Sequence, residues 1–153
     1  MTYDLRVERL IDASPEVVFD TIVDPDAQAE IFADPVYDSE LLELTIDLRV
    51  GGTWNIVFGS TGKVNRITNV FTEVDRPRRL SYRVSTDLAG WSRTVENTET
   101  ITLEERDGKT LLALTEGFED EADRDAWEPS VPNYVDALER VVRRRTDATR
   151  RAK

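Results

Sequence analysis

The feature that most constrains the fold is an apolar stripe near the end of the chain. Apolar side chains recur there at intervals of three and four residues, at Val131, Tyr134, Val135, Leu138, Val141 and Val142. This spacing is typical of an α-helix that buries one face. Pro129 and Pro132 fit only at or before the first turn of a helix, so we expect the helix to run from about Ser130 to Arg145. The rest of the chain must therefore supply a surface that covers this stripe.

The middle of the chain has the pattern of consecutive antiparallel strands. Apolar residues recur in short segments, and links rich in Gly, Pro and Asp separate these segments. The predicted strands are residues 3–12, 41–50, 53–58, 63–74, 80–86, 95–105 and 110–118. Links this short favour strands that are neighbours in one antiparallel sheet.

A helix start follows directly after the first predicted strand. Ser14 is placed to cap a helix, and Pro15 stands at the first helical position, where its missing N–H costs nothing. Asp24 and Pro25 end this helix, and a second short helix is expected over about 26–32. We predict one α+β domain over residues 1–153, with a curved antiparallel sheet of six or seven strands wrapped around the long helix. The basic tail, residues 146–153, is expected to fray.

The residue types that are missing narrow the chemistry. The 153 residues include neither histidine nor cysteine, which excludes His-based proton transfer, Cys nucleophiles and His/Cys zinc sites. We find no glycine-rich nucleotide motif, and we predict no catalytic residue, no metal site and no cofactor. A net charge of −11 argues against nucleic acid as a partner, because phosphate neutralisation dominates such binding. No apolar run approaches the roughly 20 residues of a membrane span, and we expect a cytoplasmic protein.

Four segments, taken in chain order, resemble one protein superfamily. They are IDASPEVVFDTIVDPDA (11–27), LRVGGTWNIVFG (48–59), VDRPRRLSYRV (74–84) and TLEERDGKTLLALTEGF (102–118). This pattern is similar to the SRPBCC superfamily, also called START-like or birch-pollen-allergen-like, and most of all to its branch related to the activator of heat-shock protein 90 ATPase. That branch often has a tryptophan near the end of the second short helix, where this chain has Ile31 and Phe32.

The resemblance carries expectations about fold and function. It implies a helix-grip fold with a cavity between the sheet and the long helix, which members of the superfamily use for apolar or amphipathic small molecules. It implies no fixed set of catalytic residues, and it makes a homodimer an expectation. Because the superfamily covers carriers, cyclases, receptors and co-chaperone domains, the fold alone does not decide the function.

Strand parity places three polar residues on faces that are otherwise apolar. Asn97 and Glu99 lie in step with apolar residues of their strand, and Glu116 does the same on the next strand. If both strands are regular, these side chains point toward the concave side of the sheet, where a buried carboxylate marks a ligand contact or a perturbed acid. Two other interpretations stay open: glutamates near strand ends or beyond a bulge that face water, and a carboxylate pair for acid–base chemistry.

Further positions complete a set of candidate cavity-lining residues. Tyr82 is prominent because a buried hydroxyl group needs a hydrogen-bond partner. Trp127 either plugs the end of the sheet or caps the cavity entrance, and the direction of Arg66 stays open because both faces of its strand carry apolar residues. The candidate ligand-binding residues are Trp54, Phe58, Tyr82, Asn97, Glu99, Leu112, Glu116, Trp127, Tyr134 and Leu138.

Three functions are compatible with these residues. The first is non-catalytic binding of a small apolar or amphipathic molecule in the cavity. The second is a protein-interaction module of the co-chaperone kind, whose acidic surface would meet a basic partner. The third is a cyclase- or hydratase-type enzyme that uses the cavity carboxylates for proton transfer.

Overall fold

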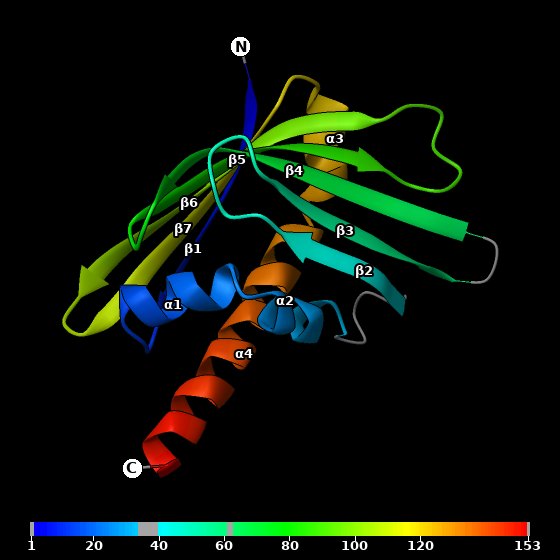
Figure 1. Ribbon diagram of the computed structural model, residues 1–153. Coiled ribbons are helices and arrows are strands. Elements are labelled where there is room, and N and C mark those ends of the chain that lie inside the picture. The colour runs from blue at the N-terminus through cyan, green and yellow to red at the C-terminus, as the bar shows by residue number, and fades with distance from the viewer. Residues whose placement is uncertain (1, 34–39, 61–62, 153) are drawn as a thin grey trace.

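The structure is a computed structural model that describes residues 2–33, 40–60 and 63–152. It contains one antiparallel sheet that arches over the helices (Figure 1). In chain order the elements are β1 (Tyr3–Ile11), α1 (Pro15–Ile22), α2 (Pro25–Phe32), β2 (Glu40–Ile46), β3 (Thr53–Ser60), β4 (Lys63–Asp75), β5 (Arg79–Asp87), β6 (Val95–Arg106), β7 (Lys109–Phe118), α3 (Glu121–Trp127) and α4 (Ser130–Ala152). None of the helices within the described residues is long and apolar enough to span a membrane.

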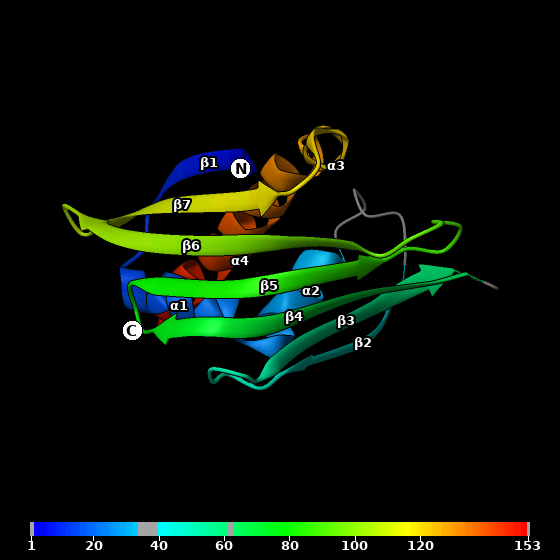
Figure 2. The ribbon, with the colours of Figure 1, turned by 90° about the horizontal axis from the view of Figure 1, so that it is seen from above.

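The sheet has seven strands in the order β1-β7-β6-β5-β4-β3-β2. Every neighbouring pair of strands is antiparallel. β1 is an edge strand that pairs with β7, and the strands from β2 to β7 each pair with the next strand along the chain. Seen from above, the strands lie side by side with α1, α2 and α4 beneath them (Figure 2). The predicted α+β helix-grip fold is therefore confirmed.

The two short helices begin as the sequence indicates. The Ser14 side chain caps α1 by accepting a hydrogen bond from the Val17 N–H at 3.3 Å, and Pro15 occupies the first helical position. The Asp24 side chain caps α2 in the same way, through the Asp26 N–H at 3.2 Å. These caps satisfy N–H groups that a helix start leaves without partners, and they fix where the chain turns back under the sheet.

The apolar stripe of α4 forms the centre of the core. Its buried members are Val131, Val135, Leu138, Val141 and Val142, with Ala137 beside them. They pack with the buried residues of α1, α2 and the concave face of the sheet. Two ion pairs from Arg9 on β1, to Asp136 at 2.8 Å and Glu139 at 2.9 Å, tie the helix to the edge of the sheet.

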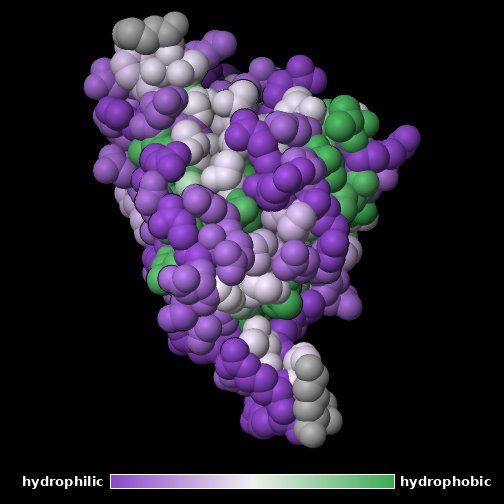
Figure 3. Space-filling view, turned by 90° about the vertical axis from the view of Figure 1, so that its left-hand side faces the viewer, coloured by the Kyte–Doolittle hydropathy of each residue, from purple (hydrophilic) through white to green (hydrophobic). Residues whose placement is uncertain are grey.

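The expected end of this helix was wrong. We expected it to end at about Arg145, whereas α4 runs to Ala152. The expected fraying of residues 146–153 stays a prediction. No Gly or Pro follows Pro132, and basic side chains at a helix C-terminus are favourable to the helix dipole. Arg143 also pairs with Glu139 one turn earlier. The polar end of α4 projects from the body of the molecule, at the bottom of Figure 3.

Smaller differences concern the second strand, the third helix and one arginine. β2 ends at Ile46 rather than at Val50, because the chain turns through Gly51 with a positive φ of 83°. The seven-residue helix α3 was not predicted at all. Arg66 lies exposed, which settles the direction that the sequence left open.

Candidate functional site

A cavity of about 340 Å³ lies between the concave face of the sheet and the first turns of α4. Seven aromatic side chains dominate its wall: Phe32, Trp54, Phe58, Tyr82, Trp91, Trp127 and Tyr134. Aliphatic residues complete most of the rest, and small side chains at Thr86, Ala126 and Ser130 leave the space open. Phe32 contributes its ring from the end of α2.

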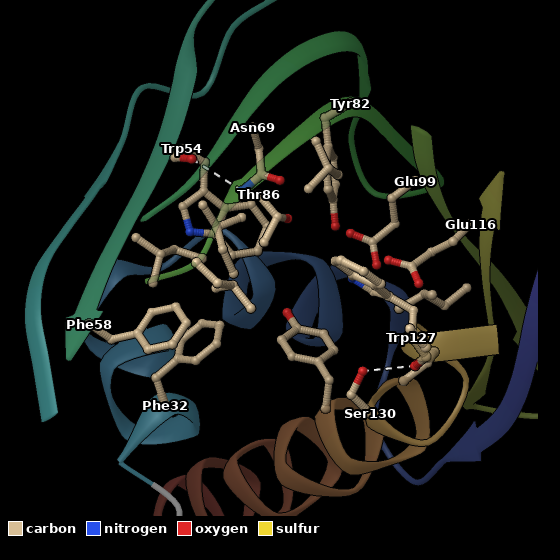
Figure 4. A pocket seen from close by; sticks show the side chains of 18 of the residues that line it. Phe32, Trp54, Phe58, Asn69, Tyr82, Thr86, Glu99, Glu116, Trp127 and Ser130 are labelled. Carbon is tan, nitrogen blue, oxygen red and sulfur yellow. Dashed lines mark hydrogen bonds between the residues drawn. The ribbon is translucent and has the colours of Figure 1, made fainter. Parts of the chain in front are cut away.

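Polar side chains cross the floor of the cavity in one row. Tyr82 on β5 lies opposite Glu99 on β6, and Glu99 lies opposite Glu116 on β7. Side chains directly opposite on one face of an antiparallel pair have Cβ atoms roughly 5 Å apart. Figure 4 shows the two carboxyl groups directed toward each other, with the Tyr82 hydroxyl group beside Glu99. We refer to Glu99 and Glu116 as the carboxyl pair.

Of the two directions considered for these glutamates, the structure shows the inward one. Both strands keep regular pairing from Asn97 to Arg106 and from Lys109 to Phe118, with no bulge between β6 and β7. Glu116 is only 7% exposed, and both glutamates line the cavity. The strand-end and bulge alternatives therefore do not describe this molecule.

Burial makes both carboxyl groups weaker acids. Desolvation is the largest cause for Glu99 and raises its pKa from 4.5 to about 7, although hydrogen bonds from Tyr82 and Glu116 oppose this rise. Desolvation also raises the pKa of Glu116 to about 9, and the nearby charge of Glu99 adds to the effect. At neutral pH the carboxyl pair therefore keeps at least one proton, with protonated Glu116 donating a hydrogen bond to Glu99.

The tyrosine beside the pair is a weak acid as well. Burial raises the pKa of Tyr82 well above 10, and the charge of Glu99 contributes to the same direction. The ring is held by edge-on contacts with Trp54 and Phe71, at centroid distances of 5.6 and 6.0 Å. Tyr82 therefore serves as a fixed hydroxyl donor toward Glu99.

Several buried polar atoms at the site lack a partner within the described part of the chain. They are Glu116 Oε2, Asn97 Oδ1, Trp54 Nε1 and Thr86 Oγ1. Unsatisfied buried polar atoms are rare because each carries a desolvation cost. Three of these four residues line the cavity, so a bound molecule or water inside it would supply the missing contacts.

The entrance is built from a loop and a short helix. Trp91, in the loop between β5 and β6, is 40% exposed and meets Trp127 of α3 at a centroid distance of 5.2 Å. Trp127 also packs on Phe118 at 5.6 Å, so it both closes the end of the sheet and lines the cavity. An ion pair between Arg93 and Asp123 at 2.9 Å joins the loop to α3.

The structure brings most of the candidate residues together. Seven of the ten candidates are among the lining residues: Trp54, Phe58, Tyr82, Glu99, Glu116, Trp127 and Tyr134. Leu112 and Leu138 are fully buried in the core instead, and Asn97 lies behind the lining, where its amide hydrogen-bonds Glu116. These three are therefore not among the residues that line this cavity, and a part for them in ligand binding stays a prediction. Strand and helix periodicity give the face of a residue but not its distance from the cavity.

Other lining residues were missed by the sequence analysis. Asn69 and Thr86 are polar residues at apolar strand positions, the same signal that identified the glutamates. Asn69 donates a hydrogen bond to the Trp54 carbonyl oxygen at 3.1 Å, which keeps that strand pair together. Trp91 lies in a loop, where no periodic pattern could have placed it.

No cluster of three or more acidic side chains in the described ranges is arranged to hold a metal ion. The lining groups capable of chemistry are the carboxyl pair, the hydroxyl groups of Tyr82 and Tyr134, and small polar side chains. Tyr134 accepts a hydrogen bond from the Gln28 side chain at 2.9 Å, which links the cavity wall to α2. The arrangement suits hydrogen bonding or proton exchange at one end of an apolar space.

Comparison with known proteins agrees with this architecture. A comparison with curated proteins found no match. Solved structures of similar fold include an uncharacterised protein from Rhizobium leguminosarum, with 22% identity, 94% of this chain and 96% of that chain covered, and a TM-score of 0.80. Mll3558 from Rhizobium loti is 20% identical, with 92% and 97% covered and a TM-score of 0.78. A protein from Arthrobacter aurescens is 18% identical, with 92% and 86% covered and a TM-score of 0.76.

These identities show a shared fold and carry no activity over to this chain. The sequence comparison is more specific. Residues 12–143 match the family described as Activator of Hsp90 ATPase homolog 1-like protein, and this match spans most of the chain. The chain therefore belongs to the family of Activator of Hsp90 ATPase homolog 1-like proteins, within the SRPBCC superfamily.

Proposed function

We propose that this protein binds a small, largely apolar molecule with one polar end in the cavity between the sheet and α4. The observation that carries the proposal is the inward-facing row of Tyr82, Glu99 and Glu116 in an otherwise aromatic and aliphatic wall. A wall that only had to fill a core would not retain two carboxyl groups, because each is costly to bury. The volume of about 340 Å³ falls within the roughly 300–1,000 Å³ of small-molecule sites.

The two parts of the wall would have different roles. The aromatic rings would remove the apolar body of the ligand from water, at roughly 25 cal/mol per Å² of apolar surface buried. The carboxyl pair and Tyr82 would orient the polar end through hydrogen bonds. The entrance beside Trp91 and Trp127 would then cover the ligand after it enters.

Native mass spectrometry and thermal unfolding, with a panel of medium-chain and aromatic amphiphiles, test this proposal. A cavity ligand present at about a hundredfold excess over its Kd is expected to raise the unfolding temperature by roughly 5 °C or more. If no member of the panel forms a complex or raises the unfolding temperature, the proposal is wrong.

A matched pair of variants places any binding in the cavity. Ala126 is exposed on α3 and lines the cavity, so Ala126→Trp is expected to obstruct it and to weaken binding about tenfold or more. Ala122 lies one turn earlier on the same helix and outside the lining, so Ala122→Trp is the control and is expected to leave binding unchanged. Equal effects of the two changes would contradict binding at this site.

A second candidate function is proton-transfer catalysis of the cyclase or hydratase kind. It is favoured by one observation, the contact between two acids whose pKa values are raised to different extents, to about 7 and about 9. Such a pair offers a base and an acid at neutral pH. A change in the mass of a bound ligand during incubation with the protein would favour catalysis, provided that Glu99→Gln abolishes this change and leaves the fold intact.

A further inference from the structure

We propose that the polar end of the ligand is a cation, and that the site takes an apolar amine whose ammonium group lies against Glu99 and Glu116. This inference rests on the proposed function and names the chemical class of its ligand. It excludes fatty acids and other anionic amphiphiles as the preferred occupants of the cavity.

The charges around the cavity have one sign. The titratable side chains that line it are Tyr82 from β5, Glu99 from β6, Glu116 from β7 and Tyr134 from α4, and every one of them is an acid. No lysine or arginine is among the lining residues in the described part of the chain. The negative charge of the carboxyl pair therefore has no counterion in the wall of the cavity.

Glu116 supplies an independent indication of a hydrogen-bond donor. Its side chain is 7% exposed, and its Oε2 atom has no hydrogen-bond partner among the described residues. Glu116 lines the cavity, so a small rotation of its side chain would let a donor group of the occupant satisfy this oxygen. An ammonium group brings up to three N–H donors, so it could contact both carboxyl groups at once. Hydrogen bonds between ions are about twice as strong as those between neutral groups.

The aromatic wall suits the same charge. Figure 4 shows the Trp127 ring beside the carboxyl pair, and Tyr134 is among the residues that line the same cavity. The faces of such rings attract cations, and the attraction is strongest where water is removed. An anionic end group would meet only acids and the negative faces of rings. An alcohol would satisfy hydrogen bonds but would leave the negative charge without a partner.

Isothermal titration calorimetry with three molecules of equal chain length tests the inference. The probes are n-octylamine, n-octanol and octanoic acid, at about pH 8, where Glu99 is mostly ionised. We expect n-octylamine to bind about tenfold more tightly than n-octanol, and octanoate to bind most weakly. Equal binding of amine and alcohol, or tightest binding of octanoate, would overturn the cation while leaving the proposed cavity function intact. Failure of all three probes would count against both.

The pH dependence gives a second, independent measure. As pH falls from about 8 to about 5, Glu99 gains a proton, and an ammonium group must displace that proton in order to bind. The affinity for n-octylamine is therefore expected to fall, with proton release that appears as a buffer-dependent heat of binding. The affinity for n-octanol is expected to stay nearly constant. An octylamine affinity that does not change over this range would contradict the inference.

Variants of the glutamates complete the test. Glu99→Gln is expected to weaken n-octylamine binding about tenfold more than it weakens n-octanol binding, and thermal unfolding reports that the variant is folded. Glu116→Gln serves as the second variant, and it is expected to weaken n-octylamine binding less than Glu99→Gln does, because Glu116 is mostly protonated at pH 8. Glu96, on the same strand as Glu99 but exposed on its other face, is the matched control, and Glu96→Gln is expected to leave both affinities unchanged. Loss of alcohol binding together with amine binding in both site variants would contradict a specific role of the charge.

Discussion

At the scale of single residues, the carboxyl pair carries a cost of desolvation that raises both pKa values. Glu99 and Glu116 face each other on adjacent strands, where two apolar side chains would pack at lower cost. Desolvation is the main reason that both pKa values are raised, and for Glu116 the nearby charge of Glu99 adds to the rise. A site that binds a polar group would need this compromise, whereas a solid core would not.

This compromise predicts how stability changes with pH. A carboxyl group whose folded pKa exceeds its unfolded value holds more protons when folded, so the free energy of unfolding falls as pH rises between the two values. For the carboxyl pair this interval runs from about 4.5 to about 9. Glu116→Gln removes one of the titrating groups. Between pH 5 and pH 9, its free energy of unfolding is expected to rise by roughly 1–3 kcal/mol relative to that of the unmodified protein, as measured by denaturant unfolding.

This change in the free energy of unfolding distinguishes Glu116, which faces the cavity, from Glu96, which faces water. Glu96→Gln, on the exposed face of β6, is expected to show no such gain. A Glu116→Gln variant that loses stability relative to the unmodified protein as pH rises would mean that the carboxyl group is not buried as described.

At this scale, the sequence predicts which residues share one face of a strand, but it does not predict which of them line the cavity. Period-two parity put Glu99 and Glu116 in step with apolar residues of their strands, because side chains alternate strictly in regular strands, but it left their direction open. It could not separate these residues from Leu112, which lies on the same face but in the closed core. The difference depends on where α4 crosses the sheet, and no single strand carries that information.

At the scale of elements, local signals determine where helices begin, and less local ones determine where they end. Ser14 and Pro15 predicted the start of α1, and Asp24 and Pro25 the start of α2, because caps act on the N–H groups next to them. The end of α4 was misplaced, since its last turns have neither a stop signal nor a buried face. The helix α3 was missed because none of its residues is buried and it has no apolar period.

The cap of α1 yields a prediction at this scale. Ser14→Ala removes the side-chain acceptor for the Val17 N–H, which is expected to lower the free energy of unfolding by about 1 kcal/mol. Ser14→Asp keeps an acceptor in the same place and is expected to stay within a few tenths of the unmodified value. Chemical denaturation monitored by tryptophan fluorescence measures both. If alanine and aspartate lower stability equally, the cap contributes little to this fold.

At the scale of the whole molecule, the sheet covers α4 completely along one part of its length and incompletely along another. Val135, Leu138 and Val142 are buried where α1 and α2 close the space beneath the sheet. Near Ser130 and Tyr134 the same arrangement leaves the cavity. One face of α4 therefore contributes to the core of the fold and to one wall of the candidate site, as the resemblance to the helix-grip superfamily implied.

The tryptophans allow a direct test of the account. The chain has three, Trp54, Trp91 and Trp127, and all of them line the cavity. Every indole N–H signal in a nitrogen–proton correlation spectrum therefore comes from a residue that lines the cavity. We predict that titration with the amphiphile that binds best in the native mass-spectrometry panel shifts all three signals with one common Kd. Saturation of the protein with that amphiphile while all three indole signals stay in place would contradict ligand binding in the cavity.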